Sequence, residues 1–156
     1  MRVKRQQGFT LIEILIVIVI LGVIAGIVIP AFANMTDDSY QKAFIINVKK
    51  IAKVAEYHYQ CTGEYFEDSE TGEMPAGLGQ YIQSSLWTCQ TPIGGRWDFE
   101  RNSYGLKSAF GVHFENVTPQ DDEYMLEIDT ELDDGNLMTG YFRKLTGDRF
   151  YYIVAQ

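Results

Sequence analysis

The chain has 156 residues and a formal net charge of −8 at neutral pH. An acidic balance of this kind excludes the basic surface with which most nucleic-acid-binding proteins attach, and we expect no nucleic acid partner. Roughly 120 residues follow the apolar N-terminal run, which is enough for one small domain with its own core.

A short basic leader precedes a long apolar run. Arg2, Lys4 and Arg5 come before Gly8, and residues 14–33 carry no charge. A helix rises about 1.5 Å per residue, so roughly twenty residues cross the ~30 Å hydrocarbon core of a membrane. The run is longer than that of a cleaved secretory signal. Residues 9–33 are therefore predicted to be a transmembrane helical segment, with the leader held in the cytoplasm by its positive charge.

The junction between the leader and the apolar run reads Gly8, Phe9, Thr10, Leu11, Ile12 and Glu13. This sequence resembles the cleavage and methylation signature of type IV pilins and type II secretion pseudopilins. The resemblance implies that residues 1–8 are a leader peptide, that a prepilin peptidase cuts between Gly8 and Phe9, and that Phe9 is then N-methylated. The alternative is an uncleaved signal anchor on an unrelated domain.

Glu13 is the one charged residue within the apolar stretch. A carboxylate at the centre of a bilayer costs about 2.5–3.5 kcal/mol, so such residues usually have a functional partner. Cleavage after Gly8 would create an amine on Phe9, four residues before Glu13. The carboxylate is predicted to pair with the amine of its own subunit or of a neighbour, and the family resemblance favours the neighbour. The alternative is a side chain that extends to the membrane interface.

Gly22, Gly26 and Pro30 recur every four residues on one face of the predicted helix. Pro30 leaves the carbonyl of Gly26 without its usual hydrogen bond, and each glycine weakens a helix by about 1 kcal/mol relative to alanine. The two glycines also fit a close contact between helices. The pattern predicts a segment that bends or loses helix when packed in an assembly. Harmless glycines in a transmembrane helix are the alternative.

The helix is predicted to continue beyond the membrane. Apolar residues recur at three- and four-residue spacing over residues 34–60, which is typical of an amphipathic helix. A helix over residues 9–59 is expected, with its second half packed on a sheet. The positions of this stripe are Tyr40, Phe44, Val48, Ile51, Ala55 and Tyr59.

Residues 61–156 are predicted to form a periplasmic or extracellular globular domain. A connector with one helical turn near residues 78–83 leads to two strands, one around Trp97 and the other around Phe110. Thr118 is expected to cap a short helix that ends before Gly135. Two further strands are expected at residues 137–144 and 149–154. The fold class is α+β and pilin-like: a long N-terminal helix on an antiparallel sheet of about four strands, with one short crossing helix.

Cys61 and Cys89 are the only cysteines, and both lie on the predicted periplasmic side. An oxidising compartment permits a disulfide between them. Free buried thiols are the alternative, and two cysteines without histidine partners make a poor zinc site.

The region of residues 118–135 carries eight acidic residues and no basic one. Oxygen ligands for calcium are available from Asp129, Asp133, Asp134 and Asn136, and some pseudopilins are known to carry calcium in this region. The spacing does not match an EF-hand. The sequence favours a solvated acidic helix face, so no cofactor is expected unless calcium binds here.

We find no sequence motif for catalysis, because His58 and His113 lie in no nucleophile, phosphate or metal pattern. The chain is therefore predicted to be a structural, non-enzymatic subunit of a type IV pilus-like filament or a type II secretion pseudopilus. It would be a single-pass protein of the bacterial inner membrane before assembly, with a cytoplasmic N-terminus. The expected partners are membrane lipid, copies of itself, other pilin-like subunits, prepilin peptidase and an inner-membrane assembly platform. The alternative is a monomeric membrane-anchored periplasmic binding domain that uses the same export signal.

Overall fold

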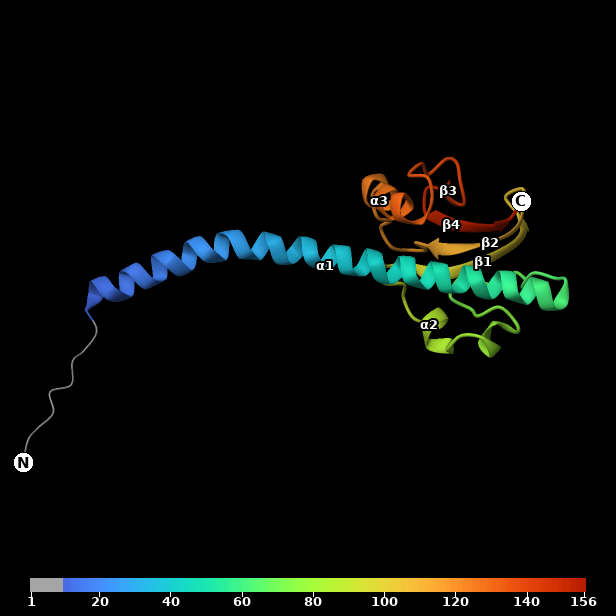
Figure 1. Ribbon diagram of the computed structural model, residues 1–156, viewed down its shortest axis with the longest axis horizontal. Helices are drawn as coiled ribbons and strands as arrows, with labels where there is room; N and C mark the ends of the chain where they lie inside the picture. The colour runs from blue at the N-terminus through green and yellow to red at the C-terminus, as the bar shows by residue number, and fades with distance from the viewer. Residues whose placement is uncertain (1–9) are drawn as a thin grey trace, which may run out of the picture. The chain divides into compact units, whose positions relative to one another are not determined.

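The computed structural model describes residues 10–156, and within the first helix it describes the backbone but not the side chains of residues 28–36. The chain divides into two compact units, Met1–Ser39 and Tyr40–Gln156, called below the N-terminal and the C-terminal unit. The helix α1, Leu11–Thr62, contributes residues to both (Figure 1).

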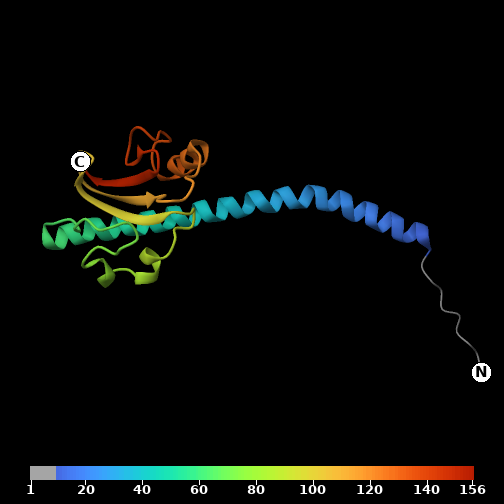
Figure 2. The ribbon, with the colours of Figure 1, turned by 180° about the vertical axis from the view of Figure 1, so that it is seen from behind.

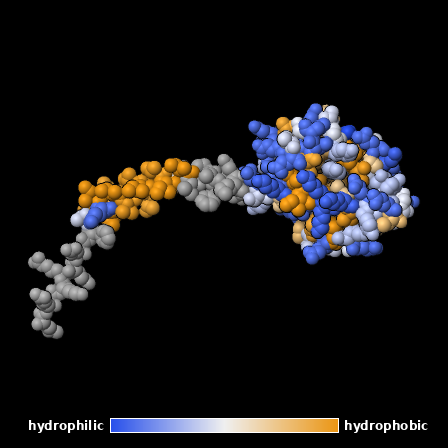
Figure 3. Space-filling model, viewed as in Figure 1, coloured by the Kyte–Doolittle hydropathy of each residue, from blue (hydrophilic) through white to orange (hydrophobic). Residues whose placement is uncertain are grey.

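The N-terminal unit consists, in its described part, of the first turns of α1. The large apolar side chains of residues 11–27 are between 50% and 91% exposed. In Figure 3 the visible face of this stretch is hydrophobic except for a hydrophilic patch at its beginning. Apart from its first and last turns, a helix pairs its backbone hydrogen-bonding groups internally, which is what a segment in apolar surroundings requires. Among the described residues, no helix has the length and hydropathy expected of a membrane span.

The C-terminal unit contains the rest of α1, a four-stranded sheet and short helices. Its elements after α1 are η1 (Leu78–Gln80), α2 (Ser84–Thr88), β1 (Arg96–Ser103), β2 (Leu106–His113), α3 (Asp122–Leu132), β3 (Phe142–Thr146) and β4 (Arg149–Ala155). The strands are antiparallel in the order β1-β2-β4-β3. Two hairpins therefore lie side by side through β2 and β4, and α3 belongs to the connection between them.

The core lies between the C-terminal part of α1 and one face of the sheet (Figure 2). Phe44 of α1 stacks on Trp97 of β1 with 5.2 Å between ring centroids, and Trp97 in turn packs against Trp87 of α2 at 6.0 Å. Four positions of the predicted stripe are buried, whereas Tyr40 and Tyr59 at its two ends are exposed. The buried four are Phe44, Val48, Ile51 and Ala55. The predicted α+β, pilin-like fold is confirmed.

Two local predictions of element boundaries are wrong. Helix α3 is capped by Asp121 and not by Thr118, because the Asp121 carboxylate accepts the Tyr124 N–H at 2.8 Å. The residues between them stay outside the helix, where the Gln120 side chain donates to the Ile93 carbonyl oxygen at 2.9 Å. The sequence did not indicate α2, although η1 lies within the helical turn that was expected.

Strand β3 also begins later than predicted, at Phe142 in place of Leu137. The intervening residues form a loop around two aspartates that end α3. The Asp133 carboxylate accepts the Tyr141 N–H, and the Asp134 carboxylate accepts the Thr139 hydroxyl at 2.8 Å. Because donors of this loop bond to aspartate side chains, pairing with β4 as a strand starts only after the loop, at Phe142.

Candidate functional sites

The first candidate site is the beginning of α1, where Thr10 and Glu13 bond to each other. The Glu13 Oε2 atom accepts the Thr10 N–H at 2.7 Å and the Thr10 hydroxyl at 2.7 Å. In the other direction, the Glu13 N–H donates to the Thr10 hydroxyl oxygen at 3.4 Å. This reciprocal pattern is a capping box, in which the residue before the helix and the third helical residue satisfy each other's backbone donors. The threonine-x-x-glutamate spacing indicates this capping role of Thr10, which was not among the predictions from the sequence.

The exposed apolar helix that follows is the second candidate site. Every large apolar side chain from Leu11 to Ile27 is at least half exposed. A methyl group placed on Gly22 or Gly26 would have no atom within 4 Å, so among the described residues nothing packs at either glycine. A surface of this size on a soluble monomer is unusual, and it indicates contact with lipid or with other protein chains.

The two cysteines do not form the predicted disulfide. Both thiols are free and exposed. Cys61 lies in the last turn of α1, where it contacts the Tyr57 hydroxyl, whereas Cys89 is the C-terminal capping residue of α2. The predicted disulfide is therefore wrong, and the alternative of free buried thiols is right about the free thiols and wrong about their burial.

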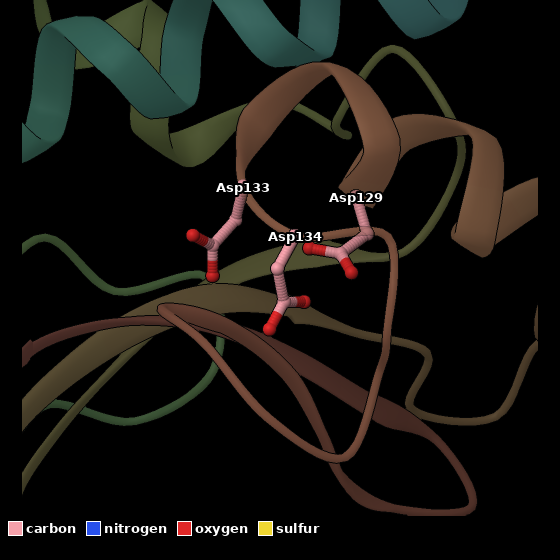
Figure 4. Close-up of side chains that lie close together, drawn as sticks. All are labelled: Asp129, Asp133 and Asp134. Atoms are coloured by element: carbon pink, nitrogen blue, oxygen red, sulfur yellow. The ribbon is translucent and has the colours of Figure 1, made fainter.

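The third candidate site is a group of three aspartates at the C-terminal end of α3 (Figure 4). One carboxylate oxygen from each of Asp129, Asp133 and Asp134 lies within 4.8 Å of the others. Asp129 is completely buried, and neither of its oxygens has a hydrogen-bond partner. A solvated acidic helix face, which the sequence favoured, is therefore wrong for Asp129. The fourth predicted ligand, Asn136, uses its side-chain oxygen to accept the Met138 N–H at 3.1 Å.

Electrostatics at this site oppose a negative charge on Asp129. Burial raises the pKa of its carboxyl from 3.8 to about 6. The backbone N–H groups of Asn136 and Gly135 counteract this rise without reaching hydrogen-bonding geometry, and the carboxylates of Asp134 and Asp133 add to it. A buried carboxylate without a partner costs free energy unless it is neutralised. A cation between the three aspartates would provide that neutralisation.

A polar network, not foreseen in the sequence, covers the face of the sheet opposite α1. Asp98 of β1 is buried there, with the Arg149 guanidinium 3.0 Å from its carboxylate. The Tyr151 hydroxyl donates to the same carboxylate, and burial, followed by the charge of Asp98, strongly raises the pKa of that hydroxyl. Arg149 also contacts Glu100. The two acids of β1 lie 49–53 residues before their partners in β4, so no local sequence pattern could reveal these contacts.

His113 joins Asp98, Glu100 and Arg149 of this network in lining a pocket of about 300 Å³. Its Nε2 lies 3.2 Å from the Asp148 carboxylate, and its Nδ1 lies 2.8 Å from the Thr71 hydroxyl. The histidine, which lies in no catalytic or metal motif of the sequence, is buried among these polar partners. Arg149 and the carboxylates of this face satisfy one another, which is the arrangement of a structural network that joins β1, β2 and β4.

Comparisons with known proteins concern mainly the first part of the chain. A family described as the prokaryotic N-terminal methylation motif matches residues 3–29. The predicted resemblance to type IV pilins and type II secretion pseudopilins is confirmed.

Relatives come from both groups of filament proteins. The type IV narrow pilus major component PilA5 of Thermus thermophilus is 51% identical over 37 residues, which cover 24% of this chain and 32% of that protein. Type II secretion system core protein G of Escherichia coli is 38% identical over 69 residues, with 40% and 48% covered. The type IV major pilin protein PilE1 of Neisseria gonorrhoeae is 36% identical over 83 residues, with 51% and 38% covered. The chain thus spans about half, or less, of the length of these relatives, and no solved structure matches it significantly.

The pilin motif falls only partly on residues that the structure describes. The predicted processing positions, Gly8 and Phe9, lie outside the described residues, as does the side chain of Pro30. Glu13, Gly22 and Gly26 lie on the described part of α1. The pairing of Glu13 with an amine on Phe9 stays a prediction, and the partner that the structure gives Glu13 is Thr10.

Proposed function

We propose that this chain is a structural subunit of a type IV pilus-like filament or a type II secretion pseudopilus, and that it polymerises through α1. The observation that carries the proposal is the exposed apolar surface of residues 11–27, which lies within the residues that match the methylation-motif family. Full burial of a leucine, isoleucine or valine side chain is worth about 1.5–3 kcal/mol. The whole segment therefore favours surroundings in which water is excluded, first lipid and then neighbouring helices.

This surface, together with the methylation motif, suggests the order in which the subunit is processed, anchored and assembled. Prepilin peptidase removes residues 1–8 and methylates Phe9 while the helix is anchored in the inner membrane, with its N-terminus in the cytoplasm. An assembly platform in that membrane then transfers the helix from lipid to a bundle of identical or related helices. Glu13 pairs with the amine of Phe9 during this transfer, and the glycines permit close approach of helices. The role is structural and requires no catalysis by the chain itself.

The experiment that tests the proposal has two readouts on the full chain expressed in a bacterium with a working prepilin peptidase. Intact mass and N-terminal sequencing are expected to show a protein that begins at methylated Phe9. Electron microscopy with labelled antibodies is expected to show the chain in sheared filaments. A mature protein that still begins at Met1, or that is found solely as monomers that do not cross-link, would refute the proposal and favour the membrane-anchored binding domain.

We further propose that the three aspartates at the end of α3 bind a divalent cation, with calcium as the preferred ion. The burial of Asp129 without a hydrogen-bond partner supports this role, since carboxylate oxygens are the ligands that calcium prefers. Asp133 and Asp134 would supply further oxygens, and their bonds to Tyr141 and Thr139 hold the loop of residues 133–141. The ion would therefore fix the loop that connects α3 to the edge strand β3.

Calcium binding is tested by thermal unfolding of the detergent-solubilised chain in calcium and in chelator. Calcium is expected to raise the midpoint of the wild-type transition. Asp129→Asn is expected to remove that shift and to raise the midpoint in chelator, because it replaces a buried charge with a neutral group of the same shape. Glu131→Gln, an exposed acid on the same helix, is the control and should keep the shift. Equal midpoints of the wild-type protein with and without calcium would contradict the assignment.

A further inference from the structure

Thr10 has no role in the proposed function so far, although it provides every described partner of the Glu13 carboxylate. Two donors of Thr10, its N–H and its hydroxyl, converge on Oε2 of Glu13 at 2.7 Å each. The hydroxyl oxygen in turn accepts the Glu13 N–H at 3.4 Å. Helix α1 begins at Leu11, directly after Thr10, which is where a capping box places its first helical residue.

The first turn of a helix leaves backbone N–H groups without partners. In water the solvent satisfies them, but in apolar surroundings an unsatisfied N–H costs several kcal/mol. The side chains that follow Thr10 are apolar except for Glu13 itself. Among the described residues of this helix end, Thr10 and Glu13 are thus the polar side chains that can bond to the unpaired backbone N–H groups. Both Thr10 bonds use Oε2, which leaves the other carboxylate oxygen, Oε1, for a further donor.

We propose that Thr10 is a positioning residue: its hydroxyl fixes the start of α1 and orients the Glu13 carboxylate so that Oε1 faces a separate amine. The consequence for assembly rests on the proposed filament function, whereas the helix cap does not. Glu13 then has two separable tasks. Its backbone and Oε2 complete the cap with Thr10, and its charge attracts the amine.

Three variants of the full chain separate these tasks. Thr10→Val removes the hydroxyl at nearly constant shape, and Thr10→Ser keeps it. Glu13→Gln keeps an oxygen acceptor, which a capping box accepts as well as glutamate, but removes the charge. The primary readout is hydrogen exchange of the backbone amide at position 13, measured by NMR in detergent micelles.

The cap predicts that Thr10→Val accelerates this exchange by about fivefold, the typical effect of losing a capping residue. Thr10→Ser and Glu13→Gln should stay within about twofold of the wild-type chain. Unchanged exchange in Thr10→Val would overturn the proposal. Equal acceleration in Thr10→Ser would also overturn it, since that variant retains the hydroxyl, and so would equal acceleration in Glu13→Gln.

Filament yield is the second readout and distinguishes this proposal from the proposed function. Thr10→Val is expected to lower the yield, Thr10→Ser to restore it, and Glu13→Gln to abolish it although its helix start remains protected. A wild-type chain that forms no filaments would refute the filament function, while the exchange rates would still decide the cap. Normal filaments from Thr10→Val would refute the positioning of Glu13 for assembly.

Discussion

Two stretches of α1 relate to their surroundings in opposite ways. Between residues 11 and 27, large apolar side chains are exposed all around the helix. Between residues 44 and 55, one face is buried against the sheet, while the exposed positions are three lysines and Ile46. The second stretch therefore finds its partners within the chain, whereas the first must find them in lipid or in other chains.

This difference assigns separate tasks to the two units. Substitutions in the C-terminal unit act on the free energy of unfolding of a domain that has its own core. Substitutions in the N-terminal unit act on partition and assembly, because the core residues found among the described part of the chain all lie in the C-terminal unit. A substitution in the N-terminal unit that changed the free energy of unfolding, or one in the C-terminal unit that changed assembly alone, would contradict this division of tasks.

The largest effect is expected from a charge placed in the exposed apolar stretch. Val19→Glu adds a second carboxylate to residues 11–27 of α1, where Glu13 is the one acidic residue. A central charge costs about 2.5–3.5 kcal/mol in a bilayer, so the yield of sheared filaments should fall on the order of a hundredfold. Unfolding of the C-terminal unit, followed by tryptophan fluorescence, should stay the same. Gln60→Glu in the last turn of α1 is the control, and a comparable loss of filaments there would contradict the division of tasks.

A second large effect is expected where α1 meets the sheet. Phe44→Ala removes a buried ring that stacks on Trp97 and meets Phe142 edge-on at 6.3 Å. Such a truncation costs about 3–5 kcal/mol, measured by urea unfolding of the detergent-solubilised chain. Ile46→Ala lies on the exposed side of the same helix, 65% exposed, and should change stability by no more than about 0.5 kcal/mol. Similar values for the two variants would mean that α1 does not pack on the sheet as described.

Periodic patterns in the sequence predicted the features that depend on neighbouring residues. The spacing of Phe44, Val48, Ile51 and Ala55 identified the buried face of α1, because helix geometry alone aligns those positions. Alternation of apolar residues identified β1 and β2 for the same reason. The start of α3 was misplaced because Thr118 and Asp121 are both good capping residues. The bond from Gln120 to Ile93, a contact over 27 residues, decides between them.

The same distinction, between features set by neighbouring residues and features set by distant contacts, applies to the candidate sites. The motif from Gly8 to Glu13 was recognisable because it is contiguous, and the capping pair within it was available from spacing alone. The separation of Cys61 and Cys89 and the burial of Asp129 depend on how distant elements pack. The Asp98, Arg149 and Tyr151 network is likewise set by strand register, which pairs β1 with β2 and β2 with β4.

A glycine-to-alanine substitution in each unit compares the packing around the two positions. Gly111 lies in β2, where an added Cβ would collide with the Phe150 carbonyl oxygen and come within 2.6 Å of the Tyr151 Cα atom. Gly111→Ala must therefore push β2 and β4 apart, at a cost of about 1–3 kcal/mol. Gly22→Ala meets no atom within 4 Å and should favour the helix by up to about 1 kcal/mol.

Urea unfolding and filament yield together check this pair of glycine variants. Gly111→Ala should lower the unfolding midpoint and leave the helical content of the N-terminal unit unchanged. Gly22→Ala should leave the midpoint unchanged, and a lower filament yield would show that helices meet at this position. A lower midpoint in Gly22→Ala would mean that the N-terminal unit contributes to the core, against the comparison.

The smallest effect is expected from Asp148, at the edge of the polar network. A hydrogen bond of 2.7 Å from the Thr146 hydroxyl lowers the pKa of its carboxyl below 3.8, and the His113 imidazole lowers it further, against an opposing effect of burial. A carboxyl with a lowered pKa stabilises the fold when it is ionised. That contribution is fully present above pH 3.8 and is lost as the pH falls through the lower value of the folded state.

Asp148→Asn should therefore be less stable than the wild-type chain at pH 7, and the gap should close as the pH is lowered well below 3.8. Urea midpoints over a pH series measure this convergence. Asp68→Asn, at an exposed position of the connector, is the control for a general loss of one charge. Because Asp148 is about half exposed, the gap at pH 7 should be smaller than the loss of stability in Phe44→Ala or Gly111→Ala. A gap that stays constant with pH would show that the asparagine disturbs the β3–β4 turn itself, and that the charge of Asp148 contributes nothing.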